Sequence, residues 1–149
     1  MSNVAAMQIP QTTTSGAAQA ETHPALIGFV FWVFGFFGLH RFYFGYPLMG
    51  ILYLLTGGLL GIGWIVDLFF LQSMSRSASR RFPRGHYDYS VAWLLFLVLG
   101  WAGVHRFYLG KTLTGILYLL TFGVFGIGIL FDYVMLNDII TDQNRLTRR

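Results

Sequence analysis

The chain has 149 residues, of which 55% are hydrophobic, 18% aromatic and only 11% charged, with a net charge of +4 and no cysteine. An ordinary soluble domain has about a quarter of its residues charged, and at this size it buries only about 68–70% of its unfolded surface. The composition therefore argues against a water-soluble monomer and a disordered chain, and the lack of cysteine excludes a disulfide scaffold and a thiolate metal site.

Residues 1–24 are predicted to form a disordered N-terminal tail. The segment is rich in Ala, Ser, Thr and Gln and has one acidic residue but no lysine or arginine. Such a composition offers too little apolar surface to offset the entropy cost of folding. It also lacks the basic stretch with which a cleaved signal peptide begins.

Four charge-free runs follow, at residues 24–39, 42–66, 89–104 and 112–131. A hydrocarbon core of about 30 Å requires roughly 20 helical residues. We therefore expect an all-α integral membrane protein with four transmembrane helices, arranged as two tandem helical hairpins. Buried helices of a soluble protein are a less favoured alternative. The expected organisation is a hairpin at 25–72, a basic linker at 73–89, a hairpin at 90–137 and a polar tail at 138–149.

The two hairpins are copies of one another. Adding 65 to each number in 38–71 maps it onto 103–136, and 20 of these 34 positions are identical. Such identity exceeds what shared hydrophobicity alone produces, so the segment is an internal duplication. Because each copy would cross the membrane twice, the repeats should be parallel and related by a pseudo-two-fold axis along the membrane normal.

Basic residues near the ends of the runs predict the orientation. The linker and the C-terminal tail hold seven of them, against three on the opposite face, namely Arg41, Arg106 and Lys111. The positive-inside rule then places both termini and the linker in the cytoplasm. The linker arginines would rest on anionic lipid, and they are Arg76, Arg80, Arg81 and Arg84. Since these charges cluster beside apolar runs, we do not expect a nucleic-acid partner.

The repeated motifs resemble the TM2 domain family. They are the turn Gly38-Leu39-His40-Arg41-Phe42-Tyr43-Phe44-Gly45, the run Gly50-Ile51-Leu52-Tyr53-Leu54-Leu55-Thr56, and Gly61-Ile62-Gly63 followed by Asp67. The second copy repeats the turn at His105, Arg106, Phe107, Tyr108 and Gly110, and it ends at Asp132. The resemblance implies a two-helix membrane hairpin without an established biochemical role. The His-Arg-Phe-Tyr form of the turn suggests a bacterial plasma membrane.

Ionisable groups inside lipid are candidates for function, and here they are Arg41, Arg106, His40, His105, Asp67 and Asp132. Depth argues against an ion pair of Arg41 with Asp67, since Asp67 lies 20 residues past Pro47, about 30 Å along a straight helix. The simpler interpretation is an interfacial carboxylate at the end of each hairpin. The alternative is a proton or cation site formed by the two carboxylates near the two-fold axis.

Glycines in the runs could either break the long helices or permit close helix packing. We favour packing, since small residues let membrane helices approach closely. The candidate packing positions are Gly35, Gly38, Gly50, Gly61, Gly63, Gly100, Gly103, Gly115, Gly126 and Gly128.

The turn residues have interfacial explanations. Arg41 and Arg106 can extend into the headgroups, where aromatic side chains form a belt from Phe42, Tyr43, Phe107 and Tyr108. A haem or metal held between the two histidines is a weak alternative, so no cofactor and no metal are expected. No arrangement of residues points to an enzyme. The favoured function is a non-catalytic accessory module that binds lipid and other membrane proteins or itself, and the alternative is ion or proton transport.

Overall fold

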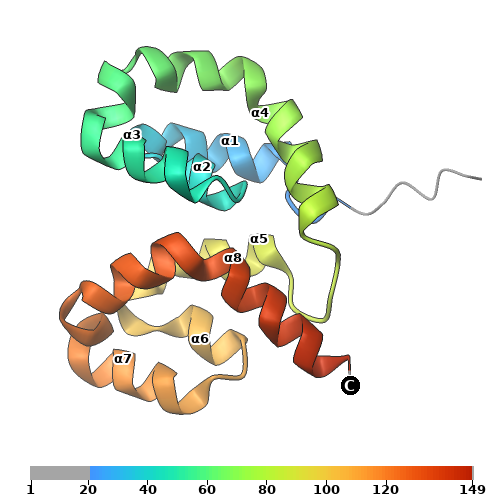
Figure 1. Cartoon of the computed structure of the whole chain (residues 1–149). Helices are drawn as coiled ribbons and strands as arrows, with labels where there is room; N and C mark the ends of the chain where they lie inside the picture. Colours follow the sequence, from blue (N-terminus) through green and yellow to red (C-terminus); the bar gives the residue numbers. More distant parts are fainter. Residues whose placement is uncertain (1–20, 149) are drawn as a thin grey trace, which may run out of the picture.

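The computed structural model describes residues 21–148, and 1–20 of the predicted tail lie outside them (Figure 1). These residues form helices and 3-10 turns, which confirms the all-α prediction. The first repeat comprises α1 (Ala25–Val33), η1 (Gly35–Phe37), α2 (Leu39–Tyr43), α3 (Pro47–Leu60) and α4 (Ile62–Arg81). The second comprises α5 (Tyr89–Leu99), η2 (Gly100–Ala102), α6 (Val104–Tyr108), α7 (Thr112–Phe125) and α8 (Ile127–Thr147).

A glycine separates the 3-10 turn from the short second helix in each repeat. Gly38 has φ 85° and its counterpart Gly103 has φ 70°, in the left-handed region that other residues avoid. A Cβ atom on Gly38 would also lie only 2.9 Å from the carbonyl oxygen of Gly50. The turn therefore requires glycine both for its backbone angle and for the close approach of α3.

Both long apolar runs are broken, which contradicts our preference for unbroken helices packed through their glycines. Five consecutive residues at 57–61 have positive φ, and so have the five counterparts at 122–126. Thr56 marks the end of the regular helix, because its hydroxyl donates to the carbonyl of Leu52 and accepts from the backbone N–H of Leu59. Thr121 makes the equivalent bonds in the second repeat.

The helices of the described chain do not match four uninterrupted spans. By length and apolar composition, none of them alone is sufficient to cross a bilayer. Helices α7 and α8 meet these criteria together, although the chain bends by 117° between them.

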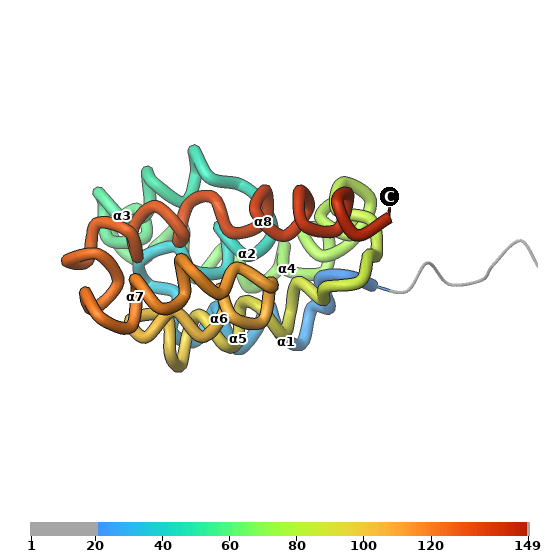
Figure 2. The backbone as a smooth tube through the Cα atoms, turned by 90° about the horizontal axis from the view of Figure 1, so that it is seen from below, coloured from blue at the N-terminus to red at the C-terminus, as the bar shows by residue number. Residues whose placement is uncertain are grey.

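The two repeats point the same way. Figures 1 and 2 show the breaks after α3 and α7 at one end of the molecule, and the linker and both ends of the described chain at the other. This arrangement agrees with parallel repeats. However, α8 packs against α2 and α3 of the first repeat, whereas no hydrogen bond or aromatic contact among residues 21–148 joins α4 to α6 or α7. The repeats are therefore stacked head to tail, and the expected two-fold relation was wrong.

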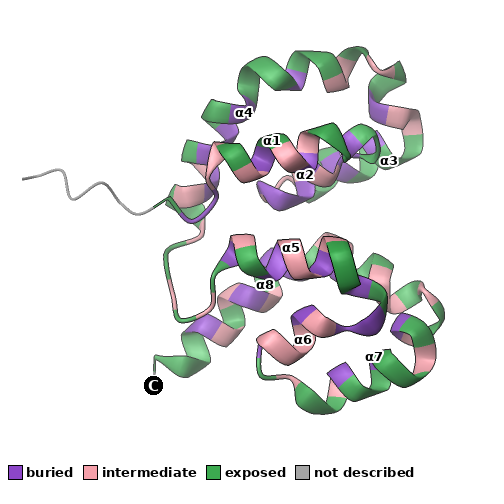
Figure 3. Cartoon of the chain, turned by 180° about the vertical axis from the view of Figure 1, so that it is seen from behind, coloured by how far each residue is buried: buried purple, intermediate pink, exposed green. Residues whose placement is uncertain are grey.

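A single core joins the repeats. Phe31 and Tyr43 of the first repeat and Trp93 and Leu136 of the second are fully buried in one cluster. Much of the outer surface is apolar instead, including Leu60 at 88% exposed, and Figure 3 shows exposed residues along the outer faces of both repeats. The core thus fixes the repeats against each other and leaves apolar side chains on the outside.

The predicted linker and C-terminal tail are largely helical. Helix α4 continues through Arg81, so only residues 82–88 form a connection without helix. Asp88 then begins α5 as its N-cap, accepting hydrogen bonds from the backbone N–H groups of Ser90 and Val91 at 2.8 and 3.3 Å. Helix α8 extends through most of the predicted polar tail to Thr147.

Candidate functional site: a buried polar centre in each repeat

Arg41 and Asp67 form an ion pair inside the first repeat. The Nε atom of Arg41 donates to Oδ2 of Asp67 at 2.7 Å, and its Nη2 atom donates to Oδ1. The depth argument against this pair was therefore wrong. It assumed a straight helix after Pro47, whereas the reversal at 57–61 brings α4 back beside α2 and returns Asp67 to the level of Arg41.

Tyr53 on α3 completes the site around the guanidinium. Its hydroxyl accepts from Nη2 of Arg41 at 3.1 Å, and the guanidinium carbon lies 4.4 Å from the centre of its ring. The arginine is thus held by a two-point carboxylate contact and by an aromatic face, both of which suit its planar shape. Sequence reasoning missed Tyr53, although its recurrence as Tyr118 in the repeated run marked it.

His40 supplies a further donor to the same carboxylate. Its Nε2 atom lies 2.7 Å from Oδ2 of Asp67, and because an ionised carboxylate only accepts, Nε2 carries the hydrogen. The ring is fully buried, and its Nδ1 atom has no hydrogen-bond partner among residues 21–148. A Cβ atom on Gly35 would lie 2.7 Å from this nitrogen, so glycine there makes room for the imidazole.

The second repeat contains the same centre. Asp132 accepts from Nε2 of His105 and from Nε of Arg106, each at 2.8 Å, and Nη2 of Arg106 donates to the hydroxyl of Tyr118 at 2.9 Å. The guanidinium carbon lies 4.1 Å from the ring centre of Tyr118. We refer to these two sets of four side chains as the buried polar centres.

Each buried polar centre is internally compensated. Asp67 is 2% exposed and Asp132 is fully buried, and each carboxylate has an arginine from its own repeat as counter-charge. The bonds satisfy both oxygens of each carboxylate, so neither oxygen needs a ligand. The aspartates are thus bound separately and do not share one site, and each histidine faces its own aspartate.

The aromatic residues of the first turn do not form an interfacial belt. Phe42 is 2% exposed and Tyr43 is fully buried in the core between the repeats. Their counterparts Phe107 and Tyr108 are half-buried. Arg41 is directed to Asp67, so extension into lipid headgroups does not describe it.

The glycines proposed for packing divide into two groups. Gly61 and Gly126 belong to the breaks, with φ of 81° and 82°, and a Cβ atom on Gly126 would meet nothing within 4 Å. At the remaining positions a Cβ atom would approach other groups closely, and these are Gly35, Gly38, Gly50, Gly63, Gly100, Gly103, Gly115 and Gly128. Gly45 and Gly110 close the two turns with φ of 74° and 73°.

The four arginines of the predicted linker differ in their surroundings. All four are exposed, but only Arg81 among them donates a side-chain hydrogen bond within residues 21–148. Arg81 donates from Nη2 to the carbonyl of Phe44 and from Nη1 to that of Gly45, both at 3.1 Å. Arg81 therefore fastens the end of α4 to the first turn.

Two further contacts were not apparent in the sequence because they involve residues without a counterpart of the same type. Trp32 on α1 and Trp64 on α4 stack with ring centres 4.6 Å apart. Each indole N–H donates to the other residue's carbonyl, at 2.7 and 2.9 Å. Their counterparts are Leu97 and Ile129, so the second repeat has no equivalent pair of tryptophans.

The second of these contacts is a polar junction between the repeats. Asn137 on α8 accepts from the indole N–H of Trp93 at 2.7 Å, and its Oδ1 atom lies 3.5 Å from Nε2 of His23. His23 is fully buried. Burial lowers the pKa of its imidazole to about 4, because desolvation disfavours the charged form, and nearby Arg81 acts in the same direction while the contact with Asn137 opposes it.

Comparison with known proteins agrees with this repeated architecture. The family model described as TM2 domain matches twice, at residues 21–69 and 85–134. A TM2 domain-containing protein of Dictyostelium discoideum is 50% identical over 52 residues, which cover 35% of this chain and 38% of that protein. TM2 domain-containing protein 1 of Homo sapiens is 47% identical over 51 residues, which cover 34% of this chain and 25% of that protein.

The aligned segments thus span well under half of these relatives, and no solved structure matches. Both matches of the family model include a complete buried polar centre, from the turn motif to the aspartate. The chain belongs to the TM2 domain family and carries two tandem TM2 domains.

Proposed function

We propose that this chain is a non-catalytic membrane module, which binds lipid and associates with other membrane proteins or with itself. Its place would be the plasma membrane, in particular a bacterial inner membrane, with both termini in the cytoplasm. Ion or proton transport is the competing function.

The outer surface supports a membrane environment. Exposed apolar side chains cover the outer helices, and at the breaks they include Leu60, Ile62, Phe125 and Ile127 at 88, 70, 85 and 74% exposed. Monomeric soluble proteins rarely expose continuous apolar patches larger than a few hundred Å². In a bilayer the same side chains would be solvated by lipid tails.

The observation that carries the proposal is the pairing inside each buried polar centre. A carboxylate in a transport path must exchange its partner for the transported ion or proton. Asp67 and Asp132 instead each have an arginine and a histidine as donors, and they do not form a carboxylate pair. The geometry favours a fixed internal bond that holds two helices together.

The position of the two turns supports the proposed orientation. Arg81 at the end of α4 bonds to the carbonyls of Phe44 and Gly45, and the hydroxyl of Tyr108 accepts from the backbone N–H of Asp88. Both turns thus lie at the same end of the molecule as the connection at 82–88, so the expectation that Lys111 lies on the face opposite the linker was wrong, and Lys111 does not oppose a cytoplasmic linker. Basic residues on the cytoplasmic side remain the stronger signal under the positive-inside rule. Cysteine labelling of Ser2→Cys with a membrane-impermeant reagent in intact cells tests the orientation. No labelling is expected until the cells are opened.

Proton flux into proteoliposomes separates the interaction module from the transporter. We expect vesicles containing the intact chain to leak protons no faster than protein-free vesicles under an imposed potential. A leak that disappears in the Asp67→Asn/Asp132→Asn variant would contradict the proposal, provided that the variant remains folded by circular dichroism. Affinity purification from native membranes provides the positive test, because an interaction module should co-purify with membrane proteins or with tagged copies of itself.

A further inference from the structure

The first turn is covered by side chains from two helices. Nδ2 of Asn137 on α8 donates to the carbonyls of Phe42 and Tyr43, at 3.0 and 2.9 Å. Arg81 on α4 donates to the carbonyls of Phe44 and Gly45. All four carbonyls at the end of this turn therefore receive a side-chain donor.

The second turn lacks this cover. Within residues 21–148, the carbonyls at 107–110 receive no hydrogen bond from a side chain, and the counterpart of Arg81 is Leu146, which has no donor. Phe107 and Tyr108 are half-buried and Gly110 is exposed, whereas their counterparts Phe42 and Tyr43 are buried. The carbonyls of the turn are thus covered by side chains in the first repeat and uncovered in the second. We call the segment at 107–110 the open turn.

Helix α4 presents the surface that would match this open turn. The counterpart of Asn137 is Gln72, which has the same carboxamide on a side chain one methylene longer and is exposed. The counterpart of Tyr133, whose ring lies 4.4 Å from that of Phe42 across the repeat interface, is Leu68, which is partly exposed at 38%. In the described residues the side chain of Gln72 makes no hydrogen bond.

We propose that a second copy of this chain docks the outer face of its α4, around Leu68 and Gln72, on the open turn at 107–110. The packing would repeat that of α8 on the first turn. The inference deepens the proposed interaction role and rests on it. The chain itself supplies the template, since its own repeats already bind each other in this way.

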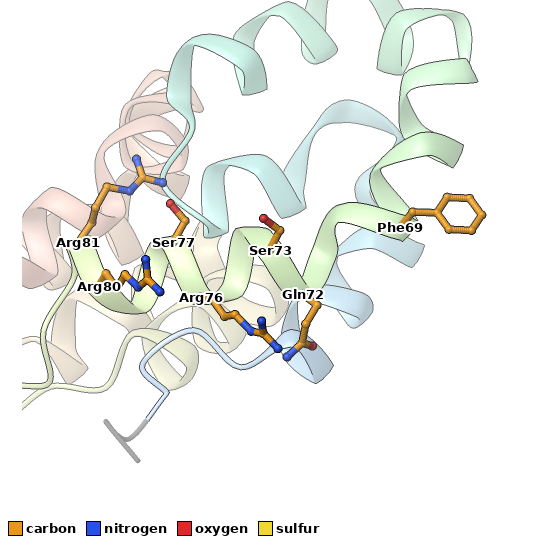
Figure 4. A pocket seen from close by; sticks show the side chains of 7 residues that line it. All are labelled: Phe69, Gln72, Ser73, Arg76, Ser77, Arg80 and Arg81. Carbon is orange, nitrogen blue, oxygen red and sulfur yellow. The ribbon is translucent and has the colours of Figure 1, made fainter. Parts of the chain in front are cut away.

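Charges on the two surfaces are complementary. His23 contacts Asn137 at the internal junction, and its counterpart beside the open turn is Asp88, which is exposed. Gln72 and Arg76 project from the same side of α4, one helical turn apart (Figure 4). Docking would therefore bring Arg76 near Asp88, and Arg76 has no ion-pair partner within residues 21–148.

The two surfaces lie at opposite edges of the stacked repeats. Figure 1 shows α4 on the outer side of the first repeat, and α6 and α7 on the outer side of the second. A contact between different surfaces of identical chains is heterologous and can continue from copy to copy. Because the repeats stack side by side with their breaks at one end, the assembly would grow within the plane of a membrane.

Cross-linking tests this contact directly, because the chain has no cysteine of its own. We would mix chains carrying Ser73→Cys with chains carrying Lys111→Cys, the residue after the open turn, in liposomes with a short bifunctional maleimide. Ser73 is the exposed residue next to Gln72, and its counterpart Asp138 is exposed beside the internal contact, so the substitution keeps the carboxamide of Gln72 in place. A dimer-sized adduct is expected from the mixture and not from either variant alone. The Ser73→Cys/Lys111→Cys double variant should give a ladder of larger adducts.

The first turn provides a matched control. Tyr46→Cys lies at the position equivalent to Lys111 but on the turn that α8 already covers, so its mixture with Ser73→Cys should give no adduct. Adding Arg76→Glu to the Ser73→Cys chain should lower the adduct yield at least about fivefold, because it places two negative charges together.

Three results would overturn the inference: no adduct from the mixture, an equal adduct from Ser73→Cys alone, or an equal adduct with Tyr46→Cys. Carbonate extraction of the same membranes keeps these failures separate from failure of the proposed function. A chain that resists extraction but gives no adduct refutes the docking contact alone. A chain that is stripped from the membrane refutes the membrane module itself.

Discussion

Arg41 and Asp67 are 26 residues apart in the chain, yet Nε of the arginine lies 2.7 Å from Oδ2 of the aspartate. We expect Asp67→Asn to lower the free energy of unfolding by about 3–5 kcal/mol, since it leaves a half-buried guanidinium without its counter-charge. Thermal unfolding in detergent measures this loss. The exposed Asp138 provides the control, and Asp138→Asn should change stability by less than about 0.5 kcal/mol. Equal effects of the two substitutions would show that the pair is not formed.

The left-handed break in the second repeat can be tested by adding a single methyl group. Gly126 has φ 82°, and a Cβ atom there would meet nothing within 4 Å. Gly126→Ala should therefore lower stability by about 1–2 kcal/mol through backbone strain alone. If the run were an unbroken helix, the same substitution would raise stability by about 1 kcal/mol, because alanine favours helix. The sign of the change in unfolding temperature decides between the two.

Asn137 and Gln72 are equivalent positions with different surroundings. Asn137 bonds to Trp93 and to two carbonyls of the first turn, whereas Gln72 is exposed. Asn137→Ala should lower the free energy of unfolding by about 2–4 kcal/mol, because it leaves several buried polar groups unsatisfied. Gln72→Ala in dilute detergent should lower the free energy of unfolding by less than about 0.5 kcal/mol. Similar losses from the two variants would argue against the head-to-tail stacking of the repeats.

His23 should make stability fall in acid. Burial lowers the pKa of its imidazole in the folded chain to about 4, against 6.5 as the reference value. The unfolded chain therefore binds the proton first as the pH falls from about 6.5 to 4, and stability decreases by up to about 3 kcal/mol over that range. Denaturant titrations across this range should show a shallower slope for His23→Gln. An unchanged slope would mean that His23 is hydrated in the folded state.

The sequence was sufficient for the features that repeat. The 65-residue duplication predicted two copies of one helical unit, and its identical positions include all four members of each buried polar centre. The all-α class followed from charge-free runs close to the length of a membrane helix. Even so, the identity of Tyr53 and Tyr118 was noted only as part of a run, because nothing local showed that their hydroxyls meet an arginine.

The tertiary contacts were not predictable from local pattern. A glycine pair such as Gly57-Gly58 is compatible with both close packing and a reversal, and we favoured packing. That choice kept the second helix straight and so placed Asp67 about 30 Å from the level of Arg41. The head-to-tail stacking depends on residues that differ between the copies, such as Asn137 and Gln72. A search for identical residues in the two copies does not identify such positions.

The reversal of the first long run is the central claim, and the contact between Trp32 and Trp64 tests it most directly. In an unbroken hairpin these residues would differ in depth by about 15 Å, whereas here their rings stack at 4.6 Å. The measurement is cross-linking of the Trp32→Cys/Trp64→Cys variant in membranes with a short bifunctional thiol reagent, followed by mass spectrometry. Our account predicts a cross-link within one chain between positions 32 and 64. Full modification of both cysteines with no link between them would contradict it.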